Sequence, residues 1–201
     1  MSDLASLPTR PGPPQRRRKP LRLPSAFRYY EVELPGRLSD KADRLTTAGL
    51  VPTCDRRPID ADLTGDWHQL VIDAGLRTDE PTLWFAEGLI QYLPKERARN
   101  LFHDMHALSA TGSAACGDFV DGEFFSEPEH HRMLSRIATL GLSMTSIDDP
   151  IHWFAHEGWS AQIFRPSDLL AGSHPFLSIP IPERLAVRRP GIGYFLAKYQ
   201  P

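Results

Sequence analysis

Cysteine is scarce in this chain. The 201 residues include only Cys54 and Cys116, which stand far apart and form no C-x-x-C pair. This excludes a disulfide framework and a zinc site built on paired cysteines. Two isolated thiols fit a reducing compartment, so we expect a cytoplasmic protein.

Long apolar runs are also missing. No stretch approaches the roughly 18 apolar residues of a membrane span, and the basic N-terminus lacks the apolar segment of a secretory signal. We therefore expect no membrane partner. The net charge is only −2, which gives no overall reason to expect a nucleic-acid partner.

Signature motifs of several enzyme classes are absent. Neither G-x-S-x-G nor G-x-x-x-x-G-K-[ST] occurs, so α/β-hydrolase and P-loop chemistry have no support. Two histidine pairs, His103/His106 and His152/His156, have helical spacing, but there is no H-E-x-x-H and no cysteine joins either pair. We predict no metal site and interpret these histidines as surface or packed residues.

Residues 1–24 are rich in proline and arginine, with six prolines and six basic residues against the single acid Asp3. Such a composition buries too little apolar surface to offset the entropy of ordering. We predict a disordered tail over residues 1–24 and one domain over residues 25–201. The basic run Arg16–Lys19 leaves a nucleic-acid-binding module as an alternative, although no aromatic residue is interleaved.

Strand-like and helix-like segments alternate along the rest of the chain. The strand candidates are residues 27–34, 57–63, 83–86, 113–120, 159–164 and 193–199. The helix candidates are residues 39–50, 67–74, 95–108, 128–140 and 166–171, with Ser39 and Asp66 as N-caps of the first two. This alternation predicts an α/β fold with a layered, mostly parallel sheet.

The most informative stretch runs from Pro81 to Pro94. Leu83–Ala86 is a short apolar run typical of a strand buried on both faces, and Glu87–Gly88 follows it directly. Open α/β sheets place ligand-binding groups just beyond the carboxyl ends of their strands. A core strand followed by one surface glutamate is an equally consistent interpretation.

Acidic side chains end three successive strand candidates. They are Glu31 and Glu33, Asp60 and Asp62, and Glu87. Because the carboxyl ends of parallel strands share one rim, we expect these acids to converge. Carboxylates accept hydrogen bonds from ribose hydroxyls and amino groups, and they favour a nearby sulfonium-type cation. The alternative is that each acid is a solvated loop residue.

Three segments resemble successive motifs of the leucine carboxyl methyltransferase-like family, which are class I S-adenosylmethionine-dependent methyltransferases. The segments are residues 31–35 (EVELP), residues 60–67 (DADLTGDW) and residues 86–94 (AEGLIQYLP). The resemblance extends over about residues 20–201. It implies a Rossmann-like class I methyltransferase sheet, S-adenosyl-L-methionine as cofactor, and O-methylation of a small-molecule carboxylate or hydroxyl as the activity.

The resemblance also implies roles for four residues. Glu33 stands where the family holds the ribose of the cofactor, in place of the more usual aspartate. Asp62 and Leu63 match the pair that flanks the adenine, and Glu87 matches the acid near the methionine part. No catalytic residue is implied, and a carboxylate acceptor would need no general base.

One motif of the family has no counterpart here. The family's first strand ends in a glycine-rich segment, whereas residues 1–20 are rich in proline and arginine. Residues 21–24 (LRLP) resemble the stretch that follows that segment. We therefore expect an N-terminally truncated sheet, with a gap beside the strands at residues 27–34 and 83–86.

Two further questions follow from this resemblance. A non-catalytic remnant that does not bind the cofactor is the alternative function. For the acceptor side we expect residues 141–176, including Trp153, Phe154 and Trp159; the alternative for these aromatic side chains is core packing.

Overall fold

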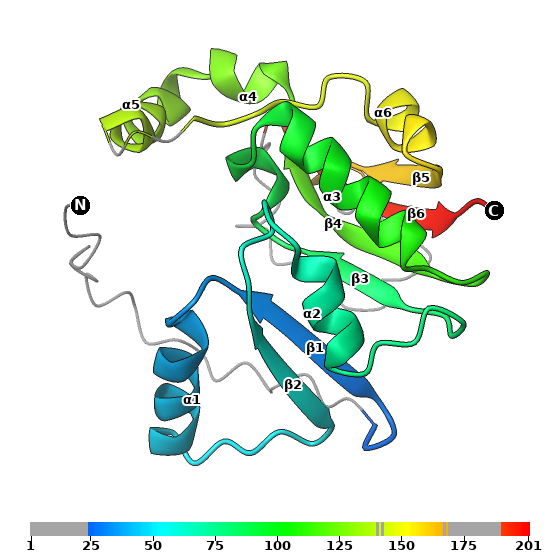
Figure 1. The fold of residues 1–201 in the computed structure, drawn as a ribbon. Coiled ribbons are helices and arrows are strands. Elements are labelled where there is room, and N and C mark those ends of the chain that lie inside the picture. The colour runs from blue at the N-terminus through cyan, green and yellow to red at the C-terminus, as the bar shows by residue number, and fades with distance from the viewer. Residues whose placement is uncertain (1–23, 140, 142, 167, 169–189) are drawn as a thin grey trace. The chain divides into compact units, whose positions relative to one another are not determined.

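The computed structural model describes residues 24–139, 141, 143–166, 168 and 190–201 (Figure 1). The chain divides into two compact units, with the boundary between Asp60 and Ala61. Each unit has its own sheet. Residues 1–23 of the tail predicted for residues 1–24, and most of the helix predicted for residues 166–171, lie outside the described residues.

The first unit is a β-α-β arrangement. Strand β1 (Arg28–Glu33) pairs in parallel with strand β2 (Asp55–Asp60), and helix α1 (Arg37–Thr47) connects them. Leu38 on α1 and Ile59 on β2 are buried. The N-cap predicted at Ser39 was wrong, because the helix begins earlier, after the left-handed backbone of Gly36.

The second unit contains a four-stranded sheet in the order β3-β4-β6-β5. Its strands are β3 (Leu83–Ala86), β4 (Ala114–Val120), β5 (Trp159–Phe164) and β6 (Ile192–Tyr199). β3 pairs with β4 in parallel, and β6 runs antiparallel to both β4 and β5. The carboxyl ends of β3, β4 and β5 therefore lie along one edge of this sheet.

Helices and 3-10 turns connect these strands. They are α2 (Trp67–Asp73), η1 (Ile90–Tyr92), α3 (Lys95–Ala107), α4 (Gly122–Ser126), η2 (Pro128–His130), α5 (His131–Thr139) and α6 (Pro150–His156). The helix predicted over residues 128–140 is divided between η2 and α5, and α4 and α6 were not predicted. Asp66 stands at the predicted N-cap of α2, although its side chain makes no capping hydrogen bond.

An aromatic cluster forms the core of the second unit. Phe102 on α3 is fully buried, with ring-centroid distances of 5.2 Å to Phe154, 5.7 Å to Phe195 and 6.5 Å to Trp159. Trp153 and Phe154 come from α6, Trp159 begins β5 and Phe195 lies in the middle of β6. The expectation that Trp153, Phe154 and Trp159 face an acceptor was wrong, because burial against Phe102 places them in the core.

Strand β3 is buried on one face only. Ala86 is buried, whereas Leu83 and Phe85, which point to the opposite face, are 65% and 64% exposed. The prediction of a strand buried on both faces was therefore wrong. A four-residue apolar run does not report which of its faces is covered, because every side chain in it is apolar.

Candidate functional site

Two exposed acids end the strands of the first unit. Glu33 is the last residue of β1 and is the register partner of Asp60, the last residue of β2. Parallel pairing thus brings these two carboxylates to the same end of the two-stranded sheet, as the sequence predicted for these neighbouring strands. Solvent reaches both side chains, which suits groups that accept hydrogen bonds from a ligand.

Glu31 has a different role from Glu33. It is 7% exposed and forms ion pairs with Lys41 and with Arg56. The Nη2 atom of Arg56 lies 2.6 Å from Glu31 Oε2. Burial alone would raise the pKa of Glu31, but the hydrogen bonds from Lys41 and Arg56 outweigh it, so the pKa lies below the ordinary glutamate value of 4.5. Glu31 therefore joins α1 and β2 to β1 rather than serving a ligand.

The lowered pKa of Glu31 predicts a pH-dependent stability. A depressed carboxyl pKa stabilises the fold above the unfolded-state value, and this stabilisation is lost as pH falls through the folded-state pKa. Between pH 6 and pH 3, urea unfolding should show a larger loss of stability in the wild type than in Glu31→Gln. Equal losses in the two proteins would contradict an ionised, paired Glu31.

Asp62 is held in a tight turn after β2. Its Oδ1 accepts hydrogen bonds from the backbone N–H and the hydroxyl of Thr64, both at 2.8 Å, and these bonds lower the pKa of Asp62. The Thr64 carbonyl accepts a hydrogen bond from Arg97 on α3 at 3.1 Å, which ties the turn to that helix. Asp62 itself is exposed and Leu63 is half-buried. The turn thus presents an ionised carboxylate with an apolar neighbour.

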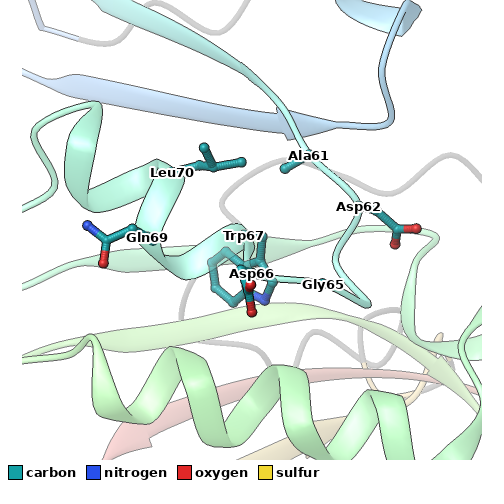
Figure 2. A pocket seen from close by; sticks show the side chains of 7 residues that line it. All are labelled: Ala61, Asp62, Gly65, Asp66, Trp67, Gln69 and Leu70. Carbon is teal, nitrogen blue, oxygen red and sulfur yellow. The ribbon is translucent and has the colours of Figure 1, made fainter.

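A hollow of about 440 Å³ adjoins this turn. Figure 2 shows Asp62 and Gly65 on the loop that precedes α2, with Trp67 and Leu70 on the helix itself. Ala61, Asp66 and Gln69 complete the lining. Trp67 is buried and Leu70 is 44% exposed, so the apolar surface open to a ligand comes from Leu70. Together with the carboxylates of Asp62 and Asp66 in the lining, this surface suits a partly polar group.

Glu87 lies directly beyond the carboxyl end of β3, as predicted, and is exposed. The next residue, Gly88, has a left-handed backbone (φ 60°), and its N–H donates to Asp118 Oδ1 at 2.6 Å. Asp118 also accepts a hydrogen bond from Gln91, Nε2 to Oδ2, at 3.2 Å. Glu87 and Asp118 therefore belong to one edge of the sheet in the second unit.

Three residues at this edge were not predicted from the sequence: Asp118, Gln91 and a further acid, Asp121. Asp121 follows β4, is buried, caps α4 through the Glu123 N–H, and pairs with Arg165, which follows β5, at 2.6 Å. A signal for Asp118 was available, because a charged residue inside an apolar strand is rarely buried without a partner. The partner itself was not visible in the sequence.

The described residues contain no group of three His, Cys, Asp or Glu side chains that could hold a metal ion. Among the same residues, none of the helices is long and apolar enough to cross a membrane. The ring of His106 stacks on Tyr199 at 4.5 Å, and His152 and His156 are exposed, in line with packed or surface histidines.

Comparison with known proteins identifies relatives of this chain. Residues 16–106 match the family model described as leucine carboxyl methyltransferase. A Mycobacterium avium protein named "Putative S-adenosyl-L-methionine-dependent methyltransferase" is 37% identical over 126 residues, which cover 62% of this chain and 41% of the relative. A Parafrankia protein of the same description is 33% identical over 176 residues, or 86% of this chain and 54% of the relative. The chain thus spans about half the length of these curated relatives.

Solved structures agree on the fold. A DUF574 family protein from Streptomyces avermitilis matches with a TM-score of 0.64 and 15% identity, covering 88% of this chain and 66% of that one. The crystal structure of a Thermobifida fusca protein described as a "putative methyltransferase" matches with a TM-score of 0.55 and 12% identity. The match covers 88% of this chain and 64% of that one. The chain has the α/β, Rossmann-like fold of class I methyltransferases. The resemblance seen in the sequence is confirmed: residues 16–106 are similar to the leucine carboxyl methyltransferase family, and the curated relatives carry the name of S-adenosyl-L-methionine-dependent methyltransferases.

Proposed function

We propose that this chain serves S-adenosylmethionine-dependent methyl transfer to an oxygen, carboxylate or hydroxyl, of a small molecule. The observation that carries the proposal is the Asp62 turn, which holds an ionised carboxylate and Leu63 at the position that flanks the adenine in the related family. The relatedness in sequence supports the same activity.

The residues present suit this cofactor. The bonds that Asp62 makes within the described chain use Oδ1, so Oδ2 is available to accept a hydrogen bond from an amino group. The hollow beside Asp62 offers apolar surface from Leu70. Glu33 would accept hydrogen bonds from ribose hydroxyls, and Glu87 would attract the ammonium group of the methionine part.

Catalysis by this chain would consist of binding, orientation and exclusion of water. When bound, S-adenosylmethionine would supply an electrophilic methyl group for transfer to the acceptor oxygen. Asp62 and Glu87 would fix the orientation of the bound cofactor. A carboxylate acceptor is already ionised at neutral pH, so no residue of this chain would need to remove a proton.

Calorimetry with S-adenosylhomocysteine, the demethylated product, tests the proposal. The wild type should bind it, and Asp62→Asn should bind about three- to tenfold more weakly, because a charged acceptor becomes a neutral amide. Asp43→Asn is the matched control, since Asp43 is an exposed aspartate on α1. This control should bind as the wild type does.

Three outcomes would count against the proposal. Absence of binding heat at high protein concentration would favour a non-catalytic remnant. Equal affinities of the wild type and Asp62→Asn would remove Asp62 from the site. Salt-dependent binding to RNA or DNA, lost on deletion of residues 1–20, would support a nucleic-acid-binding module with Arg16–Lys19 instead; these residues lie outside the described part of the chain.

A further inference from the structure

The turn that carries Glu87 is held by a side chain from the neighbouring strand. The Gly88 N–H donates to Asp118 Oδ1 at 2.6 Å across 30 residues of sequence. A carboxylate that accepts from a backbone N–H forms a charge-assisted hydrogen bond, which is stronger than a neutral one. Gly88 also has φ 60°, a conformation in which most residues are strained. The Glu87–Gly88 turn is thus fixed by the left-handed backbone of Gly88 and by its hydrogen bond to Asp118.

The approach of the two strands places Asp118 within reach. Gly117 is the register partner of Ala86 at the end of β3, and a Cβ at position 117 would lie 2.1 Å from the Ala86 carbonyl oxygen. Glycine at 117 therefore permits the close contact between β4 and β3. The next residue on β4 is Asp118, and the carboxyl end of β3 leads directly into Glu87 and Gly88.

Asp118 is itself held by the protein. Its second oxygen, Oδ2, accepts from Gln91 Nε2 at 3.2 Å, and Gln91 is only 7% exposed. The Gln91 backbone carbonyl accepts from the Thr145 N–H at 2.8 Å, which anchors this turn to a further segment. Both carboxylate oxygens of Asp118 are therefore used inside the protein, whereas Glu87 is exposed and available to a ligand.

We propose that Asp118, supported by Gln91, is a positioning residue that holds the Glu87–Gly88 turn ready to receive the amino-acid end of the cofactor. This inference depends on the proposed function. A turn held in place before binding loses less conformational entropy when the ligand arrives, so Asp118 raises affinity without touching the ligand. Its contribution should be seen in cofactor affinity and in the environment of the Gly88 amide.

Asp118→Asn is a conservative test, because the side-chain amide of Gln91 can rotate to fit the new residue. In the described chain Gln91 Oε1 is buried without a hydrogen-bond partner, while Nε2 faces Asp118. In Asp118→Asn, the Oδ1 of the new side chain can still accept from Gly88. A rotated Gln91 amide would then offer Oε1 to the new Nδ2. Asp118→Asn should therefore keep both contacts, whereas Asp118→Leu, of similar size, loses both.

The experiment combines calorimetry with S-adenosylhomocysteine and the amide proton shift of Gly88 in nuclear magnetic resonance spectra. Asp118→Leu should bind at least about tenfold more weakly and move the Gly88 resonance upfield, while Asp118→Asn stays within about threefold of the wild type. Ser113→Ala is the matched control, because Ser113 Oγ accepts from the Thr82 N–H at 3.0 Å, at the other end of the β3–β4 pair. It removes the same kind of bond elsewhere and should leave affinity unchanged.

The outcomes separate the two proposals. If the wild type binds and Asp118→Leu binds equally well, the positioning role is overturned and the proposed function stands. If the wild type does not bind, the proposed function fails and the positioning role fails with it. Should Asp118→Leu not fold, Gln91→Met, which removes the support of Oδ2, should weaken binding about threefold, and wild-type affinity there would overturn the role.

Discussion

Replacing Phe102 with alanine is expected to lower the free energy of unfolding by about 3–5 kcal/mol, the range for deleting a large aromatic side chain from a packed core. Phe102 is fully buried and its ring lies within 6.5 Å, centroid to centroid, of four other aromatic rings. These rings come from α6, β5 and β6, so the substitution would leave a cavity between three elements. Urea unfolding followed by tryptophan fluorescence measures the effect.

Phe85→Ala is the matched control for this prediction. Phe85 is 64% exposed on β3, so the same truncation there should change the free energy of unfolding by less than about 1 kcal/mol. Equal losses for the two variants would contradict the assignment of the core to the α3 face of the sheet. A small loss for Phe102→Ala alone would mean that the aromatic cluster collapses to fill the space.

Replacing Glu33 with alanine is expected to weaken binding of S-adenosylhomocysteine about 10- to 100-fold. If Glu33 accepts hydrogen bonds from the ribose, its removal loses one or two bonds to a charged acceptor. Glu33 is exposed at the end of β1, with Asp60 as its partner across the ladder, so stability should change little. Calorimetry measures the affinity, and urea unfolding checks the fold.

Glu33→Asp keeps the carboxylate charge and shortens the side chain by one methylene group, so it tests the charge apart from the side-chain length. The related family usually has aspartate at this position, so this variant should stay within about threefold of the wild type. Glu129→Ala is the control, because Glu129 is a similarly exposed glutamate in η2. If Glu33→Ala also binds as the wild type does, Glu33 has no part in holding the cofactor.

Several elements could be predicted from local sequence. Leu83–Ala86 and Trp159–Phe164 form strands with the predicted bounds, and the helix predicted from Lys95 ends one residue earlier than expected. The reason is that glycine and proline end helices and strands through their own backbone preferences, which do not depend on the rest of the fold. The two short helices α4 and α6 escaped prediction because one or two turns show too little periodicity.

The candidate site was partly predictable for the same reason. Glu33, Asp62 and Glu87 stand next to strand ends that local patterns reveal, and the structure places each of them at or just beyond such an end. The different roles of Glu31 and Glu33 were not predictable, because the role of Glu31 depends on its ion pairs with Lys41 and Arg56.

The order of residues was enough to determine where β3 ends, which acid follows it, and which family the chain resembles, because these depend on neighbours in sequence. Only the tertiary structure decided which face of β3 is covered and which tryptophans form the core. It alone joined Asp118 to Gly88, because that bond depends on the register between two strands and on the close approach that Gly117 allows. Strand register follows from packing over the whole sheet, and no local pattern encodes it.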